Sequence, residues 1–118
     1  WPTLSKVMTG ETPRADLRAE VRRPQPGLIE FDLVNAGDAD FAGNPEVEAT
    51  WTGAKPVASD GLRGFEPCSI ATNVVCFRNS HQPLRIRPQE RQMIGWLRLA
   101  ADEKVAVEIH QTADDQRN

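Results

Sequence analysis

The strongest constraint on the fold is a strict alternation of apolar and acidic residues within the segment 28–34. The alternating residues are Ile29, Glu30, Phe31, Asp32 and Leu33. Successive side chains of a β-strand point to opposite faces, so this period of two places the apolar residues on one face and the acids on the other. One apolar and one acidic face are typical of an antiparallel sheet with one side in solvent. We therefore expect strands that cover a core on one side only.

Further short segments along the chain also indicate strands, most of them with the same period and two, 62–66 and 74–78, without it. They cover residues 17–21, 47–51, 62–66, 74–78, 83–88, 92–99 and 105–109. Nine prolines and eight glycines supply turn residues between them. No long amphipathic helical pattern lies between these segments, and a parallel sheet would need such crossover helices. About seven or eight short strands predict an antiparallel β-sandwich of the Ig-like or fibronectin-like kind, with a small barrel as the alternative.

Length and charge exclude several classes of protein. The 118 residues, 39% of them hydrophobic and with a net charge of −3, suit one domain large enough to fold without a metal or disulfide. The acidic balance argues against general nucleic-acid binding. No apolar stretch approaches the ~20 residues that cross a bilayer, and residues 1–10 lack a signal-peptide pattern. We divide the chain into a linker or short N-terminal helical segment (1–16), the β-sandwich domain (17–111) and a polar tail (112–118).

The two cysteines, Cys68 and Cys76, flank a turn-like segment. A hairpin centred on Thr72 would bring them opposite each other across two strands. A disulfide there would add about 2–3 kcal/mol of stability and would indicate an oxidising compartment. Two buried free thiols are the alternative, because a free cysteine behaves as a small hydrophobe. We predict the disulfide.

Residues that could carry catalysis are few. Ser80 and His81 are adjacent, but adjacency does not aim an imidazole at a hydroxyl, and no GxSxG elbow is present. Cys76 lies in an apolar strand, and burial raises the pKa of a thiol. Glu30 and Asp32 share a strand face that they are expected to solvate. We therefore predict no catalytic residues, no cofactor and no enzymatic activity in this chain.

One turn gathers oxygen-bearing side chains that could hold calcium. They are Asn35, Asp38, Asp40 and Asn44. Calcium takes oxygen ligands in tight loops, but this spacing is not that of an EF-hand. Asn and Asp are also the usual turn formers, because their side chains bond to nearby backbone groups. We expect an ordinary turn and no metal.

The segment 92–99 presents a candidate docking surface. Its inward face is expected to hold Met93, Gly95, Leu97 and Leu99, with a gap at the glycine. Trp96 and Arg98 then point outward, and both residue types are frequent interface anchors. Arg85 and Arg87 share a strand face, and with Arg91 they would extend the surface as a basic stripe for an anionic ligand.

A carbohydrate platform is the competing interpretation of Trp96. Such a platform usually has several exposed aromatic side chains on a flat face, and Phe41 or Phe65 are the candidates to accompany Trp96. Trp51 shares the inward face of its segment with Val47 and is expected in the core.

Several segments resemble parts of bacterial Ig-like accessory domains. Residues 28–40 (LIEFDLVNAGDAD) are similar to a strand and turn of those domains, and residues 84–99 are similar to their strand, Pro-x-Glu turn and strand. A closer likeness rests on Trp1, Leu4, Gly10, 17–22, 26–28, 35–37, 61–65 and 94–99 in this order. Together, these segments resemble the C-terminal β-domain of an uncharacterised bacterial family. In the proteins of that family, the part that precedes this domain resembles a glycoside-hydrolase-like (β/α) barrel. The chain departs from the pattern at Gln89, where related domains often carry glycine.

The resemblance implies that this chain is part of a longer protein exported to the periplasm or beyond the cell. The matching motifs are fold motifs, so no functional residue is carried over. We expect a non-catalytic accessory domain that serves structure or interaction. Its partner would be the preceding domain of the same polypeptide or another protein, with no nucleic acid and no membrane span. A carbohydrate-binding module is the alternative.

Overall fold

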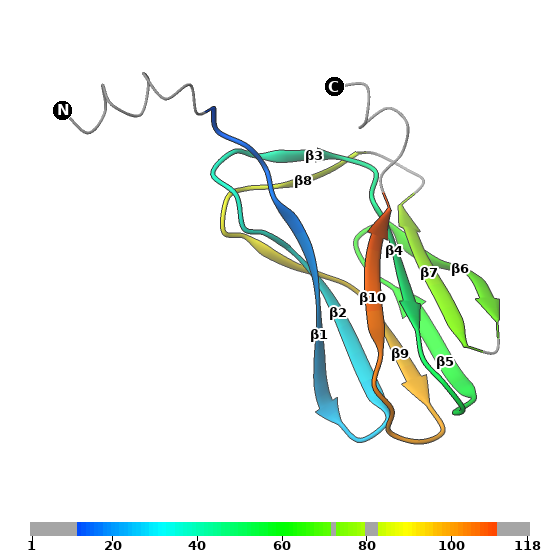
Figure 1. The fold of residues 1–118 in the computed structure, drawn as a ribbon. Coiled ribbons are helices and arrows are strands. Elements are labelled where there is room, and N and C mark those ends of the chain that lie inside the picture. Colours follow the sequence, from blue (N-terminus) through cyan, green and yellow to red (C-terminus); the bar gives the residue numbers. More distant parts are fainter. Residues whose placement is uncertain (1–11, 72, 80–82, 111–118) are drawn as a thin grey trace.

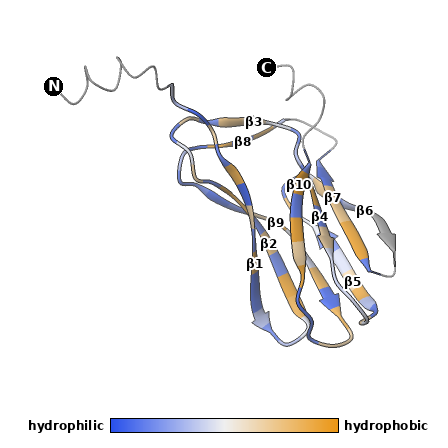
Figure 2. Ribbon diagram, viewed as in Figure 1, coloured by the Kyte–Doolittle hydropathy of each residue, from blue (hydrophilic) through white to orange (hydrophobic). Residues whose placement is uncertain are grey.

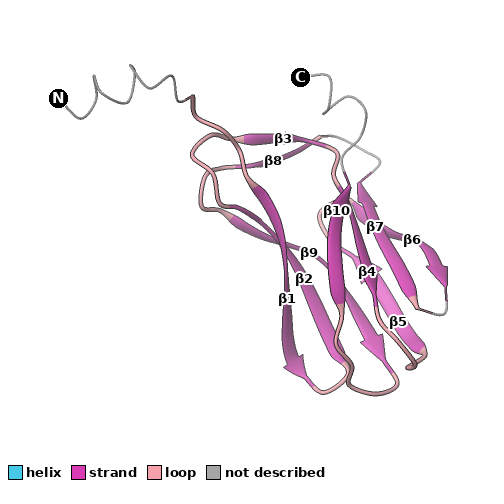
Figure 3. Ribbon diagram, in the orientation of Figure 1, coloured by secondary structure: helices cyan, strands magenta, loops and turns pink. Residues whose placement is uncertain are grey.

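The computed structural model describes residues 12–71, 73–79 and 83–110, and this part of the chain is built from strands and turns without a helix (Figures 1 and 3). The ten strands are β1 (Leu17–Gln25), β2 (Leu28–Asn35), β3 (Phe41–Gly43), β4 (Glu46–Thr50), β5 (Pro56–Gly61), β6 (Phe65–Ala71), β7 (Val74–Asn79), β8 (Leu84–Ile86), β9 (Arg91–Leu99) and β10 (Ala106–His110). Among the described residues, nothing forms a helix of the length and apolarity that crossing a membrane would take.

Two four-stranded antiparallel sheets pack face to face. The first sheet has the order β1-β2-β9-β5, and the second sheet has the order β10-β4-β7-β6. A small third sheet pairs β3 with β8 at one end of the sandwich (Figure 1). The all-β, antiparallel sandwich predicted from the alternation is therefore confirmed. The two main sheets remain separate, so the barrel alternative is wrong.

The strand count was underestimated, because two strands carry no clear sequence pattern. β3 has only three residues, and β5 is a polar segment at the edge of the first sheet where Val57 is 61% exposed. Pairing with β9 rather than an apolar face holds β5 in the sheet. The expected strand over 62–66 is instead a turn followed by the start of β6. Both proposed terminal segments, 1–16 and 112–118, lie largely or wholly outside the described residues.

A bulge in β9 reverses the predicted orientation of Met93. Gly95 pairs with Phe31, but the next pair joins Met93 to Asp32, which leaves Ile94 as the extra residue. An inserted residue shifts the alternation by one position. Ile94 is therefore fully buried, while Met93 is only partly buried and shares the outer face with Asp32. The expectation that Met93 faces the core is wrong, whereas Leu97 and Leu99 are buried as predicted.

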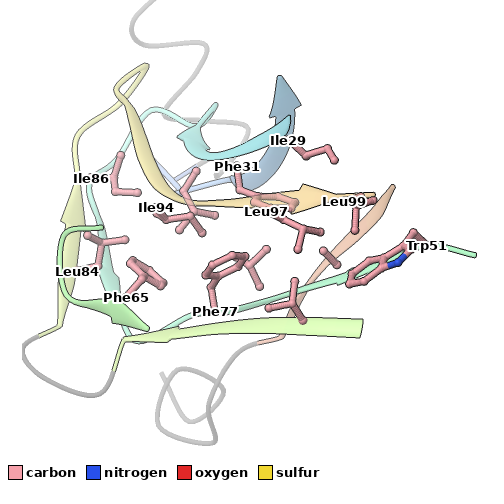
Figure 4. Packing of buried hydrophobic residues seen from close by; sticks show 14 of the residues in the cluster. Ile29, Phe31, Trp51, Phe65, Phe77, Leu84, Ile86, Ile94, Leu97 and Leu99 are labelled. Atoms are coloured by element: carbon pink, nitrogen blue, oxygen red, sulfur yellow. The ribbon is translucent and has the colours of Figure 1, made fainter. Parts of the chain in front are cut away.

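The core is closed where Phe77 of the second sheet packs over Gly95 of the first. The Phe77 ring lies 5.1 Å from that of Phe31, with the ring planes tilted by 48° (Figure 4). A Cβ atom at position 95 would lie 2.5 Å from Cε1 of Phe77. The gap predicted at Gly95 is thus filled from the opposite sheet. Figure 2 shows the resulting division, with hydrophobic positions alternating with hydrophilic ones along the strands.

Substituting Gly95 by alanine should destabilise the fold by about 1–3 kcal/mol, because the new methyl group overpacks the contact with Phe77. Urea unfolding of the wild type, Gly95→Ala, Phe77→Leu and the double variant measures this. Replacing Phe77 removes the clashing ring, so the cost of Gly95→Ala should be smaller in the Phe77→Leu background by at least about 0.5 kcal/mol. Strictly additive costs would contradict the packing described here.

Candidate functional site

The outer face of the first sheet carries Trp96 at its centre. Cross-strand pairing places Glu30 of β2 on one side of it and Asp60 of β5 on the other, and Arg22 of β1 continues the row beyond Glu30. Trp96 is partly buried, and its backbone oxygen accepts a hydrogen bond of 2.8 Å from Ser59 Oγ. We call the surface formed by Arg22, Glu30, Asp60, Trp96 and Arg98 the Trp96 face. The outward orientation predicted for Trp96 agrees with this position.

Arg98 lies two residues beyond Trp96 on the same face, and its side chain is exposed. Within the described part of the chain, no side chain forms an ion pair or hydrogen bond with it. Arg85 and Arg87 lie elsewhere. Arg85 is in β8 of the third sheet, 3.8 Å from Asp40, and Arg87 is the first residue after β8. Arg91 is engaged with two carboxylates of the first sheet. The four arginines are divided between two sheets, so they form no continuous stripe.

The other described aromatic side chains belong to the core. Phe41 and Phe65, the candidates to accompany Trp96 in a carbohydrate platform, are 8% and 3% exposed. Trp51 is buried as predicted, and its Nε1 donates a hydrogen bond of 2.8 Å to the Ala54 carbonyl. Trp96 is therefore the one described aromatic residue outside the core.

Beside Trp96, two arginines enclose the carboxylate of Asp32. Arg22 donates to it from Nε at 2.7 Å and from Nη2 at 2.9 Å, and Arg91 donates from Nη1 at 2.9 Å. In addition, Arg22 Nη1 lies 2.6 Å from Glu30 Oε1, and Arg91 Nη2 lies 2.6 Å from Glu20 Oε1. The side chain of Asp32 is only 1% exposed although it lies on the outer face. Glu30 and Asp32, the two carboxylates that share this strand face, are thus both bound by arginines.

The network determines the protonation state of Asp32. Burial alone would raise its pKa, but the hydrogen bonds and positive charges of Arg22 and Arg91 outweigh burial and lower it. A general acid requires a carboxyl group that holds its proton near neutral pH. Asp32 is therefore suited to fixing arginines on this face rather than to proton transfer.

The turn after β2 is closed by the side chain of Asn35. Its Oδ1 accepts hydrogen bonds from the backbone N–H groups of Asp16 and Gly37, and its Nδ2 donates to the carbonyls of Ala39 and Ile86. The amide is fully buried, with both ends satisfied. Asp38 Oδ1 accepts from the Arg14 N–H at 2.8 Å. Asn35 and Asp38 thus bind this turn to the chain around it, whereas Asp40 lies 3.8 Å from Arg85. The Oδ1 atom of Asn44, the fourth side chain considered for calcium, is buried without a hydrogen-bond partner among the described residues.

Gln89 lies in the turn between β8 and β9. Its φ is 68°, in the left-handed region that favours glycine. The backbone N–H of Gln89 donates to the Asn35 carbonyl at 2.7 Å, and Nε2 donates to the Gly37 carbonyl at 3.1 Å. The glutamine side chain therefore links this turn to the turn after β2.

The disulfide prediction is wrong for this structure, because both cysteines are free. The predicted hairpin is correct: β6 and β7 pair with Cys68 opposite Cys76. Register alone, however, does not bring the two sulfur atoms into bonding geometry, and the pairing shifts between Cys68 and Ala71. Cys76 Sγ instead lies 4.0 Å from Oε2 of Glu48. Burial, followed by the nearby carboxylates Glu46 and Glu48, raises the pKa of the Cys76 thiol.

A cluster on the outer face of the second sheet was missed from the sequence. It consists of Glu48 on β4 and of Glu108 and His110 on β10, and we call it the His110 cluster. The alternation of Val105, Val107 and Ile109 in the sequence places Glu108 and His110 together on the opposite face of their strand. Their approach to Glu48 depends on the pairing of β4 with β10, and no local motif marks that pairing.

An open hollow of about 550 Å³ lies near the same two strands. It is lined by Thr50, Trp51, Thr52, Lys104, Val105 and Ala106.

Ser80 and His81, considered above as a catalytic pair, lie outside the described residues.

Comparison with known proteins adds no functional assignment. A scan against protein-family models found no match to this sequence, and a search of curated proteins found no similar chain.

Replacing Asp32 by asparagine should lower stability at neutral pH by about 1–3 kcal/mol, because two arginines lose a charged acceptor. The pKa of Asp32 is lowered in the folded state, so the unfolded chain takes up the proton first and acid favours unfolding. The wild type should thus lose this contribution as the pH falls below about 4, the range of an unperturbed Asp. Urea unfolding between pH 7 and pH 2.5 should show the two proteins converging.

Asp60→Asn is the matched control, since Asp60 lies on the same face. Within the described part of the chain, its side chain accepts one hydrogen bond, from the adjacent Gly61 N–H to Oδ1 at 2.8 Å. At pH 7 its stability should stay close to that of the wild type, because no arginine is held by Asp60 among the described residues. A constant gap between the wild type and Asp32→Asn would contradict the lowered pKa.

Titration of the denatured, unreduced protein with a thiol reagent should find two free thiols, since both cysteines are unbonded. A value of zero would restore the disulfide and would contradict the structure at this hairpin.

Proposed function

We propose that this chain is a non-catalytic accessory domain of a larger exported bacterial protein, and that it docks on a neighbouring domain of the same polypeptide through the Trp96 face. The observation that carries the proposal is the position of Trp96. It is a partly exposed tryptophan at the centre of a sheet whose other described aromatic neighbours are all buried. Tryptophan and arginine are the residue types most often found as anchors of interfaces.

The arrangement around Trp96 favours a protein surface over a small ligand. The Asp32 network holds the arginines on one side of the face in place, so an approaching surface would meet side chains that are already ordered. On the other side, Arg98 has no partner within the described residues, and Asp60 is exposed. A partner surface with one acidic group and one donor would satisfy both charges.

A carbohydrate-binding module remains the second candidate, supported by Trp96 alone. Sugar rings stack on aromatic faces, and the carboxylates of Glu30 and Asp60 flank this one in register. Phe41 and Phe65 cannot extend the platform, because both are buried. The exported location rests on the resemblance alone, since the two free cysteines remove the argument from a disulfide.

The first test is the mass of the native protein in the source cells, measured by immunoblot against this domain. The proposal expects a band well above the 13.1 kDa of this chain. A band at that mass would show a free-standing protein and would overturn the accessory role.

The second test compares Trp96→Ala and Arg98→Ala with Leu62→Ala, which truncates an exposed hydrophobic side chain in the turn after β5. In the isolated domain, Trp96→Ala should change the free energy of unfolding by about 1 kcal/mol or less. In the natural polypeptide, Trp96→Ala and Arg98→Ala should speed protease cleavage between this domain and its neighbour, and Leu62→Ala should not.

The outcomes separate the two candidates. Unchanged cleavage in Trp96→Ala, combined with loss of retention on immobilised polysaccharide, would replace docking by carbohydrate binding. Unfolding of the isolated Trp96→Ala domain would show that Trp96 serves packing, and both candidates would lose their surface.

A further inference from the structure

The outer face of the second sheet carries a row of chemically reactive side chains, on the side of the sandwich opposite the Trp96 face. Cross-strand pairing places Glu108 of β10, Glu48 of β4, Cys76 of β7 and Cys68 of β6 side by side. His110 lies two residues beyond Glu108 on the same face. Figure 1 shows β10, β4, β7 and β6 next to one another in this sheet.

Three of these side chains already converge on one point. The Nε2 atom of His110 lies 3.5 Å from Oε1 of Glu48 and 3.5 Å from Oε2 of Glu108. The three ligand atoms all lie within 4.8 Å of one another. The side chains come from two different strands, so the sheet pairing itself holds them together.

The charges in this cluster are not balanced. Glu48 and Glu108 are direct cross-strand partners, and two like charges in this position destabilise a sheet. Elsewhere on the same face, Glu46 is paired with Arg78 at 2.9 Å. Among the described residues, no lysine or arginine pairs with Glu48 or Glu108, and the imidazole of His110 is their one basic neighbour. A bound cation would remove the repulsion.

The spacing and the ligand types indicate the kind of cation. A tetrahedral ion bound at about 2.0–2.1 Å sets its ligand atoms about 3.3 Å apart, close to the two distances measured from His110. One imidazole with two carboxylates suits a first-row transition metal such as zinc, whereas calcium and magnesium prefer oxygen ligands throughout.

We propose that Glu48, Glu108 and His110 bind a divalent transition-metal cation of the zinc class, with the remaining coordination position open to water. The ion would join the edge strand β10 to β4. The side chain of His110 is 50% exposed and that of Glu48 33%, so an ion reaches the cluster directly from solvent. The neighbouring Cys76 is not assigned as a ligand, since its Sγ faces the other carboxylate oxygen of Glu48.

The test titrates Zn²⁺ into the intact, metal-stripped chain by calorimetry and follows Co²⁺ by its visible absorption. The wild type should bind one ion, and the ion should raise the melting temperature. His110→Ala and Glu108→Gln should each weaken binding at least tenfold. Both side chains are at least half exposed, so these variants should keep the circular dichroism spectrum of the wild type.

Three controls make the result specific. His81→Ala removes the chain's other histidine, and Glu66→Gln removes an exposed carboxylate on β6 of the same sheet. Both should bind Zn²⁺ within twofold of the wild type. Cys76→Ser should do the same, and a large loss there would overturn the three-residue assignment. Absence of binding by the wild type, or equal binding by His110→Ala, would overturn the proposal as a whole.

Discussion

The contact of Phe77 with Phe31 across Gly95 is the constraint on which the rest of this structure depends. It joins the centres of the two sheets, because Phe31 and Gly95 are partners in the first sheet and Phe77 comes from the second. The ring can approach only where β9 has no side chain. Next to this contact, Ile94 is the extra residue of the bulge, and it is fully buried. Core packing and the direction of the outer-face residues of β9 are thus decided within a few residues of each other.

The bulge has consequences for the candidate docking surface. It allows Ile94 and Leu97 both to face the core, and Trp96 lies between them on the outer face. It also brings Met93 beside Asp32, where Arg91 and Arg22 cover the carboxylate. Asp32 therefore lies on the outer face and is nevertheless almost completely buried by these arginines. It orders one side of the Trp96 face, while Arg98 on the other side has no partner in the described part of the chain.

The two outer faces of the sandwich differ in chemistry, which separates the two proposals. The first sheet presents an indole beside arginines and carboxylates, a combination suited to contact with a protein surface. The second sheet presents carboxylates, an imidazole and two thiols in adjacent rows. The inner faces hold hydrophobic side chains from both sheets (Figure 4). The two proposals therefore rest on different residues and can be tested independently.

The alternation within 28–34 determined by itself that this chain forms antiparallel strands with one wet face. The turn-like segment between Cys68 and Cys76 indicated a hairpin with the two cysteines opposite each other. Both follow from local geometry, since side chains alternate along any strand. The tertiary structure decided what depends on distant partners. The bulge at Ile94 moved Met93 to the outer face, pairing with β9 made a strand of the polar segment β5, and the two sulfur atoms remained unbonded. The His110 cluster likewise exists because β10 pairs with β4. These two strands are far apart in the sequence, and no local pattern encodes their contact.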